Sequence, residues 1–498
     1  MPALPIISLK QLRLLVDLTW LLADGVGGGI KPAILDILRW LAAQEKQPLQ
    51  FVYITRPDTH AEVMALARPA DVVIAKADFT ADLAVRLNCD VVYSPFGITE
   101  CACPSVPTIT LVVDLLHCDF PATLSEPQRI IRERQFGVAV KISDRFQVIS
   151  DYTATRLKEC YAVPAERIFR THLPVQSRLT LTKTRSQEEQ LPSINRPFFF
   201  YPANTWVHKN HEILLVAYAI YAHATQSPPW PLILTGHEDT RRRLLRELAR
   251  TLQIESHIIF AGYVPDDKLA GYYRSAGALV YPSLHEGFGI PLIEAMSLGT
   301  PILSSNSTAI PEVTGSAALL VNCREPATLA TALENIANDQ IFRDSLIEKG
   351  RIQLASFSRN TEFSRLLEAI VSVANNPAKY RRTGYYSIDG LIDPVAIFAL
   401  PVIEGPASLT IALRELPADR TLQIFCGNEL LEQHFIHANR ALQVNLTFYP
   451  QARAITLLVP DASSLSPTDP RTHGVLLESL RIGSVNGPWH DLLAAEIA

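Results

Sequence analysis

The chain has 498 residues, which corresponds to roughly three domains at about 150 residues each. It is 48% hydrophobic and 19% charged, a composition that supplies large cores and excludes an intrinsically disordered protein. The formal net charge of −5 excludes a nucleic-acid binder that works through bulk positive charge, but leaves room for a local basic site.

The cysteines and the N-terminal sequence point to a cytoplasmic protein. Seven cysteines are scattered along the chain without a CxxC pair, which argues against a disulfide framework or a zinc knuckle. No stretch reaches the ~18 apolar residues that span a bilayer, and no charged leader with an apolar run opens the sequence. We expect a soluble cytoplasmic protein, at most peripheral to the inner membrane.

Short apolar runs alternate with helix-period segments in the first part of the chain. The runs are 12–18, 50–54, 71–75, 90–93 and 108–113. The glycine loop 25–29 follows the first run, and apolar residues at helical spacing follow over 30–41. This alternation predicts parallel βαβ units in a doubly wound sheet. We assign 1–179 to a first Rossmann-like domain.

The polar, proline-ended stretch 180–197 predicts a linker, after which the alternation restarts. Strands are predicted at 198–201, 232–235, 258–260 and 278–281, and helices from about Lys209 and over 240–252. We assign 198–357 to a second Rossmann-like domain and 358–379 to a helix that returns to the first. Two such domains facing each other predict a ligand in the cleft, at the carboxyl ends of the strands.

The pattern changes to period two from about residue 380, and no lysine occurs after Lys379. Alternating apolar residues at 422–426, 442–448 and 455–459 predict an antiparallel β-sandwich over 380–498. The stretch 466–477 resembles β-sandwich tails of bacterial surface-polysaccharide proteins. Three roles stay open for this appendage: binding glycan, docking a partner protein, or capping the fold.

The most informative segment is 281–305, YPSLHEGFGIPLIEAMSLGTPILSS. A strand that ends at Tyr281 is followed by a glycine loop, Pro291 is expected at the first helical position, and Gly299 at the helix end. A glycine loop that opens into a helix presents unpaired N–H groups and a positive dipole end, which suits a diphosphate. Glu286 and Glu294 flank this turn, and a carboxylate early in the helix can accept hydrogen bonds from ribose hydroxyls.

This segment resembles the E-x7-E signature of retaining glycosyltransferases with the GT-B fold, in particular glycosyltransferase family 4. The order of elements over 258–295 is similar to that of the family, 310–313 (IPEV) stands where the family has its P-E-V element, and a weaker likeness extends over 10–375. The resemblance implies a metal-independent enzyme without a cofactor, whose donor is a nucleotide sugar such as GDP-mannose or a UDP-sugar. It implies transfer of a hexose such as mannose, with retention, onto a growing bacterial polysaccharide, lipopolysaccharide or lipid-linked glycan.

The resemblance also implies the site residues and the partners. The catalytic residues would be Glu286, Asp114 and His117. The donor-binding residues would be Lys209, Asn204, Gly287, Phe288, Gly289, Glu294, Gly28 and Gly29. Partners would be the nucleotide sugar, the glycan acceptor, a partner glycosyltransferase or the inner-membrane surface, with no nucleic acid. The first domain would then be the acceptor side.

Two positions depart from the family pattern. Asn204 stands where the family often has an arginine, and losing a charge-assisted hydrogen bond costs about 1.5–3 kcal/mol. Val113 stands where many relatives carry a histidine before the aspartate, and His117 is the candidate replacement. These departures support the alternative that the chain is an inactive, glycosyltransferase-like scaffold in a polysaccharide assembly complex.

Overall fold

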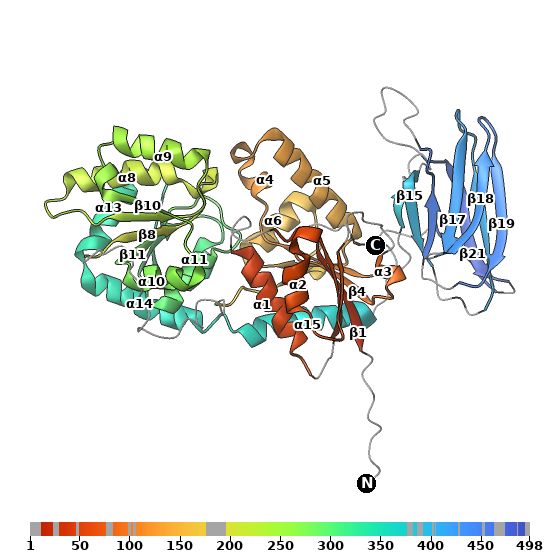
Figure 1. Cartoon of the computed structure of the whole chain (residues 1–498), viewed down its shortest axis with the longest axis horizontal. Coiled ribbons are helices and arrows are strands. Elements are labelled where there is room, and N and C mark those ends of the chain that lie inside the picture. The colour runs from red at the N-terminus through yellow and green to blue at the C-terminus, as the bar shows by residue number, and fades with distance from the viewer. Residues whose placement is uncertain are drawn as a thin grey trace, which may run out of the picture.

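The computed structural model describes most of the chain. The described residues are 11–22, 29–45, 49–75, 83–97, 101–102, 106–175, 196–375, 382–385, 392–400, 403, 405–426, 429–450, 454–462, 474–485 and 487–493. Two parallel sheets and two antiparallel sheets build three bodies that lie in a row, with the N-terminal domain in the middle (Figure 1). The expected fold class, two Rossmann-like domains that face a cleft and an all-β domain, is confirmed.

A seven-stranded parallel sheet with the order β3-β2-β1-β4-β5-β6-β7 forms the centre of the N-terminal domain. The strands are β1 (Leu12–Leu18), β2 (Leu49–Thr55), β3 (Val72–Ala75), β4 (Val91–Ser94), β5 (Thr108–Val112), β6 (Arg145–Val148) and β7 (Ile168–Arg170). The helices are α1 (Ile30–Ala42), α2 (His60–Leu66), α3 (Leu83–Arg86), α4 (Leu116–Asp119), α5 (Glu126–Ile142) and α6 (Asp151–Tyr161). In β1 every side chain except that of Arg13 is buried, as expected of a parallel strand that helices cover on both faces.

A six-stranded parallel sheet with the order β10-β9-β8-β11-β12-β13 forms the C-terminal Rossmann-like domain. The strands are β8 (Phe199–Pro202), β9 (Leu232–Thr235), β10 (Ile258–Gly262), β11 (Ala278–Tyr281), β12 (Ile302–Ser305) and β13 (Ala318–Val321). The helices are α8 (His211–Ala224), α9 (Thr240–Thr251), α10 (Asp266–Ser275), α11 (Ile290–Leu298), α12 (Ile310–Thr314), α13 (Pro326–Asn338) and α14 (Gln340–Leu354). Pro291 is the second residue of α11, not the first, because the helix begins at Ile290.

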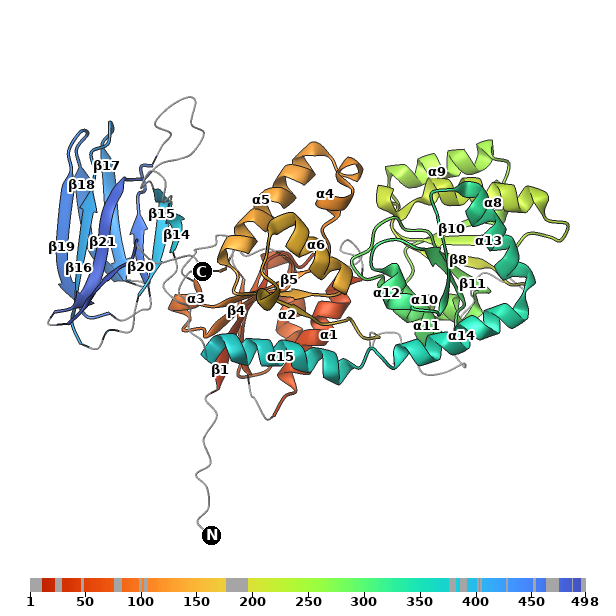
Figure 2. The ribbon, with the colours of Figure 1, turned by 180° about the vertical axis from the view of Figure 1, so that it is seen from behind.

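The helix α15 (Arg359–Asn375) crosses from the C-terminal domain to pack on α1 of the N-terminal domain (Figure 2). Its Arg359 pairs with Asp36 at 2.6 Å, and its Asn360 accepts a hydrogen bond from the indole N–H of Trp40 at 2.9 Å. The ring of Phe363 meets that of Trp40 edge-on at 5.7 Å. This helix therefore ties the end of the second domain to the first.

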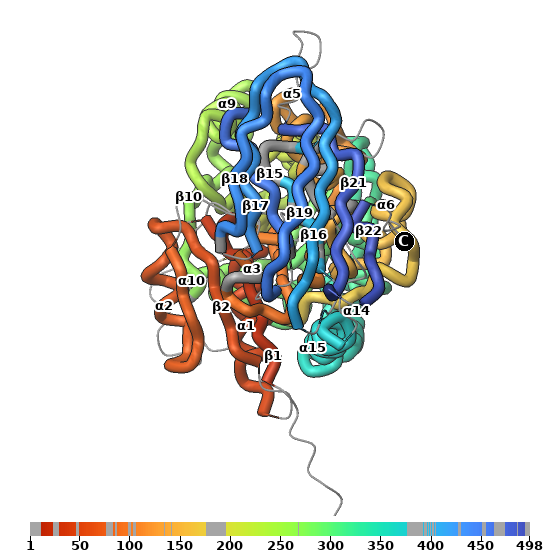
Figure 3. Tube along the Cα trace, turned by 90° about the vertical axis from the view of Figure 1, so that its right-hand side faces the viewer, coloured from red at the N-terminus to blue at the C-terminus, as the bar shows by residue number. Residues whose placement is uncertain are grey.

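In the described part of the chain, nine strands form the C-terminal β-domain, whose two sheets have the orders β14-β15-β20-β17-β18 and β19-β16-β21-β22 (Figure 3). The strands are β14 (Arg382–Tyr385), β15 (Ile392–Ala399), β16 (Ala407–Leu413), β17 (Arg420–Cys426), β18 (Glu429–Ile436), β19 (Leu442–Phe448), β20 (Ala454–Leu458), β21 (Leu477–Ser484) and β22 (Trp489–Asp491). Side chains along β16 and β17 alternate strictly between buried and half-buried, which is the pattern of a sheet with one covered face. The inward residues form a core separate from that of the other two domains.

Across the described residues, helices long and apolar enough to cross a bilayer are absent. The predicted linker 180–197 lies almost entirely outside the described residues.

Candidate active site

The topology of both sheets defines where a ligand site is expected. In parallel α/β sheets, ligands bind beyond the carboxyl ends of the strands, at the point where the strand order reverses. This point lies between β8 and β11 in the C-terminal domain and between β1 and β4 in the N-terminal domain. Lys209 follows β8, the β11–α11 loop (residues 282–289) follows β11, and Gly29 ends the connection after β1.

A cavity of about 770 Å³ opens between these two sheet edges and is lined by both domains. From the N-terminal domain the lining includes Gly29, Lys31, Val113, Asp114 and Arg132. From the C-terminal domain it includes Asn204, His208, Lys209, Arg241, His285, Glu286, Gly287, Phe288, Gly289 and Glu294. The cavity thus collects nearly all the residues that the sequence analysis selected.

The N-terminus of α11 points at this cavity. Gly289 precedes the helix with a φ of 99°, a conformation that glycine adopts without strain, and it has no side chain to cap the helix. Pro291 has no N–H and the N–H of Leu292 donates to the carbonyl of Gly289 at 2.9 Å, so among the first three helical residues Ile290 supplies the N–H that can bind an anion. The helix dipole adds a partial positive charge. At the other end, Gly299 closes the helix in the left-handed region, with a φ of 72°.

A buried ion pair stands beside this helix start. The ammonium of Lys209 lies 2.5 Å from Oε1 of Glu286, and the hydroxyl of Tyr281 donates to the same oxygen at 2.8 Å. Burial raises the pKa of Glu286, but the charge and hydrogen bond of Lys209 outweigh it and hold the pKa below its usual range. Burial, together with the charge of Lys209, lowers the pKa of the neighbouring His208 to about 4, so this imidazole is neutral at pH 7.

Glu294 lies in the second turn of α11 and is 3% exposed. Its carboxylate accepts a hydrogen bond from the hydroxyl of Tyr273 at 2.8 Å. Tyr273 lies on α10, so a neighbouring helix fixes the orientation of a carboxylate that also lines the cavity. This arrangement suits a group that accepts hydrogen bonds from ligand hydroxyls.

Asp114 brings a carboxylate to the cavity from the N-terminal domain. Burial raises its pKa, but the positive charge of Arg132, the interaction with His285 and the hydrogen bond from Leu116 outweigh burial and keep the pKa below its usual range. Its Oδ1 accepts from the N–H of Leu116 at 3.0 Å and lies 3.3 Å from the guanidinium of Arg132. Asp114 is therefore a carboxylate at neutral pH.

The two domains approach each other closely at two glycines. A Cβ added to Gly287 would lie 1.7 Å from the carbonyl oxygen of Val113, so only a glycine fits between the β11–α11 loop and the end of β5. A Cβ added to Gly29 would lie 3.0 Å from the side chain of Ile290. Gly28, predicted to act with Gly29, lies outside the described residues.

His117 does not reach the cavity, where the sequence analysis had placed it. It is 3% exposed, its Nε2 lies 2.6 Å from the hydroxyl of Tyr161, and its ring stacks on Phe136 at 4.9 Å. The helix α4 turns this side chain away from the cavity, whose lining includes His208, His237 and His285. Nε2 of His285 lies 2.9 Å from Oδ2 of Asp119. The adjacent Glu286 is the one sequence signal that points to His285, which is not among the predicted site residues.

Asn204 lines the cavity, and its side-chain oxygen accepts from the N–H of His237 at 3.0 Å. Two arginines bring positive charge to the cavity, and each is paired with a carboxylate, Arg241 with Glu212 and Arg132 with Asp114. Arg241, from the basic face of α9, and Arg132, from α5, both line the cavity. Neither is close in sequence to the glycine loop, so no local motif singles them out.

The fold and site together place this chain in the GT-B class of protein architectures. The complex of Anabaena Alr3699/HepE with UDP-glucose superposes with a TM-score of 0.58 at 16% identity, covering 73% of this chain and all of that one. WaaG, described as a glycosyltransferase involved in lipopolysaccharide biosynthesis, superposes with a TM-score of 0.51 at 14% identity, covering 72% of this chain and 99% of that one.

The amino-acid sequence identifies more specific relatives. Residues 183–353 match the family described as glycosyl transferases group 1. The O-antigen chain mannosyltransferase B of Escherichia coli is 32% identical over 216 residues, 42% of this chain and 56% of that protein. The serotype-specific mannosyltransferase WbdA of Escherichia coli is 31% identical over 252 residues, 48% of this chain and 27% of that protein. The chain therefore spans about half, or less, of the length of these relatives.

Proposed function

We propose that this protein is a retaining glycosyltransferase that moves a hexose, with mannose as the leading candidate, from a nucleotide sugar to a bacterial surface glycan. The observation that carries the proposal is the uncapped start of α11 beside Lys209, both lining a cavity shared by two Rossmann-like domains. The match of residues 183–353 and the names of the mannosyltransferase relatives support it.

The charges at the cavity suit a diphosphate leaving group. When the bond between the anomeric carbon and the diphosphate breaks, negative charge develops on the phosphate oxygens. Lys209, Arg241 and the start of α11 are positive groups at this edge of the cavity, and such preorganised charges stabilise a transition state more than a ground state. The main contribution to catalysis is then electrostatic stabilisation of the leaving group.

Glu286 and Asp114 would act on the sugar rather than on the phosphates. Both are carboxylates at neutral pH, one on each side of the cavity. A carboxylate near the anomeric carbon stabilises the positive charge that develops there, and it can accept hydrogen bonds from sugar hydroxyls. We propose transfer on one face of the sugar, with retention and hence an α-linkage, and we assign no protein nucleophile.

The test compares wild type with Glu286→Ala and Lys209→Ala across a panel of nucleotide sugars that includes GDP-mannose and UDP-glucose. Transfer or donor hydrolysis by wild type, with a loss of about 100-fold or more in kcat/KM for both variants, is expected if both groups stabilise the transition state. Equal activity in all three proteins would contradict the site. Wild type that binds a nucleoside diphosphate in calorimetry, yet turns over no nucleotide sugar, would favour the scaffold alternative.

A further inference from the structure

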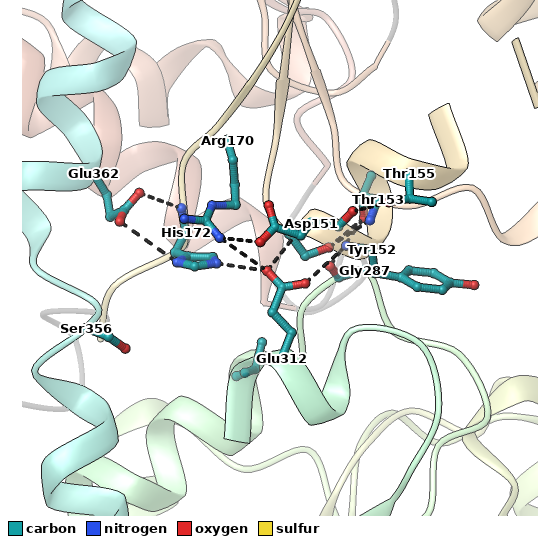
Figure 4. Close-up of polar contacts among 12 residues, drawn as sticks. Asp151, Tyr152, Thr153, Thr155, Arg170, His172, Gly287, Glu312, Ser356 and Glu362 are labelled. Atoms are coloured by element: carbon teal, nitrogen blue, oxygen red, sulfur yellow. Dashed lines mark hydrogen bonds and ion pairs between the residues drawn. The ribbon is translucent and has the colours of Figure 1, made fainter. Parts of the chain in front are cut away.

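A carboxylate from the C-terminal domain caps a helix of the N-terminal domain (Figure 4). Glu312, on α12, accepts hydrogen bonds from the backbone N–H groups of Asp151 at 2.8 Å and Tyr152 at 3.1 Å. These are the first two residues of α6, and the first N–H groups of a helix have no partner within it. The positive end of the helix dipole also favours a carboxylate at this position.

The same carboxylate binds the segment that leaves the N-terminal domain. Nε2 of His172 lies 3.0 Å from Oε1 of Glu312, and the guanidinium of Arg170 lies 3.8 Å from it. The backbone N–H of His172 in turn donates to Glu362 of α15 at 2.9 Å. Burial raises the pKa of Glu312, but the hydrogen bonds from His172 and α6 outweigh burial, so the group is a carboxylate.

Glu312 thus lies close to the two segments of the chain that connect the domains. The chain leaves the N-terminal domain after His172 and returns to it at α15, and His172 bonds both Glu312 of α12 and Glu362 of α15 (Figure 4). Closing the two domains brings α12 against α6 and the segment that contains His172. Opening the domains would break the bonds of Glu312 to both, and neither domain can replace these bonds internally.

The helix that Glu312 caps also holds the β11–α11 loop. The hydroxyl of Thr153, in the first turn of α6, lies 3.4 Å from the carbonyl oxygen of Gly287. On the other side of the loop, the N–H of Glu286 donates to the hydroxyl of Thr308 at 3.0 Å. Thr308 has a φ of 54°, a strained conformation for a β-branched residue, and it stands four residues before Glu312.

We propose that Glu312 is a positioning residue that couples closure of the two domains to binding of the nucleotide sugar. The proposal rests on the function proposed above. With Glu312 in place, α6 is held in a fixed position beside the β11–α11 loop. The N–H groups of this loop and of the start of α11, which would bind the phosphates, then face the N-terminal domain. Without Glu312, the closed arrangement loses the bonds of this carboxylate to α6 and His172. Part of the binding free energy of the nucleotide is then spent on closing the domains.

Amide hydrogen exchange tests the contact directly. In wild type the N–H groups of Asp151 and Tyr152 each donate to one carboxylate oxygen of Glu312. Glu312→Ala should lose the protection of both N–H groups, and Glu312→Gln, which keeps one acceptor oxygen, should lose the protection of one. The N–H of Thr153 is an internal control, because it is bonded to the hydroxyl of Ser150 within the N-terminal domain at 3.0 Å and should stay protected. Glu334→Gln, at an exposed position of α13, is the matched control variant.

Kinetics and calorimetry then test the coupling. We expect the KM for the nucleotide sugar and the Kd for the nucleoside diphosphate to rise about tenfold in Glu312→Gln, within the usual range for coupled sites, with kcat changed much less. The Glu334→Gln control should match wild type in both. Unchanged protection, or lost protection with unchanged affinity, would overturn the proposal. Wild type that binds no nucleoside diphosphate would instead overturn the proposed function.

The Glu312→Gln variant keeps the side-chain volume and one acceptor, so it remains informative even if Glu312→Ala fails to fold. A purely structural role would lower kcat and the fraction of folded protein together. It would not raise KM alone.

Discussion

Lys209 and Glu286 form an ion pair that is largely shielded from solvent, since their side chains are 10% and 11% exposed. Removing one partner of a buried pair leaves the other charge uncompensated, which costs about 3–5 kcal/mol. We predict that Lys209→Ala lowers the free energy of unfolding by about 3 kcal/mol. The double variant Lys209→Met/Glu286→Gln should cost clearly less than the sum of its single variants. Urea unfolding measures both, and additive costs would contradict the pairing.

Two buried histidines give the stability a specific pH dependence. Burial lowers the pKa of His208 to about 4 and that of His211 to about 3, whereas an unfolded histidine has a pKa of about 6.5. Between these values the unfolded chain binds protons that the folded chain does not. We predict that the free energy of unfolding is highest above pH 6.5 and falls as the pH decreases toward 4.

The matched variant for this prediction is His211→Phe, because the ring of His211 packs on Tyr201 at 4.7 Å and its two nitrogens have no hydrogen-bond partner among the described residues. Urea midpoints at several pH values should fall less steeply for this variant than for wild type. An equal slope in both proteins would show that His211 is not the titrating group.

Site residues that belong to one local motif were predictable from the sequence, whereas those brought in by folding were not. Glu286, Gly287 and Glu294 share one loop and helix start, so their spacing alone placed them on a common edge. Arg132 reaches the cavity from a helix of the other domain, and nothing near it in sequence marks it. Whether His117 faces the cleft depends on how α4 turns, which the local pattern does not encode.

At the scale of elements, the contact between the β11–α11 loop and β5 leads to a prediction about Gly287. Gly287→Ala would place a Cβ against the carbonyl of Val113, on the opposite domain, and should force the two apart. We predict a loss of at least about tenfold in affinity for the nucleoside diphosphate. The melting temperature should change little, because the clash lies between the domains and not inside either core. Calorimetry and thermal unfolding measure the two effects.

The control for this prediction is Gly137→Ala, in the interior of α5, where an added Cβ meets nothing within 4 Å. Replacing a helical glycine by alanine should stabilise the protein by about 0.5–1 kcal/mol and leave affinity unchanged. A Gly287→Ala variant that behaves like this control would mean that the domains do not approach as closely in solution.

Strands and helices were predictable to within a few residues where apolar runs are continuous, because parallel strands are buried on both faces. The boundaries differ where one residue takes an unusual conformation. The helix expected from about Lys209 begins at His211, since Asn210 adopts a left-handed conformation with a φ of 63° and ends a short turn first. The sequence pattern carries no signal for that conformation.

At the scale of the whole molecule, the separation of the β-domain core from the cores of the other two domains predicts two unfolding events. One large core contains residues of both Rossmann-like domains, two smaller clusters lie in the N-terminal domain, and a separate core lies entirely within the β-domain. We predict two transitions in scanning calorimetry. A nucleoside diphosphate should raise the midpoint of only the transition that belongs to the large core, because a ligand stabilises what it binds. A single transition, or two that shift equally, would contradict this independence.

The existence of the β-domain was predictable from its period-two pattern, but its position was not. The alternating apolar pattern indicates which side chains face inward. The placement of one domain beside another depends on surface contacts and connecting segments, which show no periodic sequence pattern. The N-terminal domain lies between the other two because α15 carries the chain back to it (Figure 2).

Because α15 returns to the N-terminal domain, the chain enters and leaves the two-domain part of the molecule through the same body, at β1 and at the end of α15. In the chain, the β-domain therefore follows an element that packs on the N-terminal domain. When the two domains open and close, the C-terminal Rossmann-like domain is then the part that moves relative to the N-terminal domain. Immobilising the protein through its C-terminus would therefore not hinder the opening and closing of the two domains.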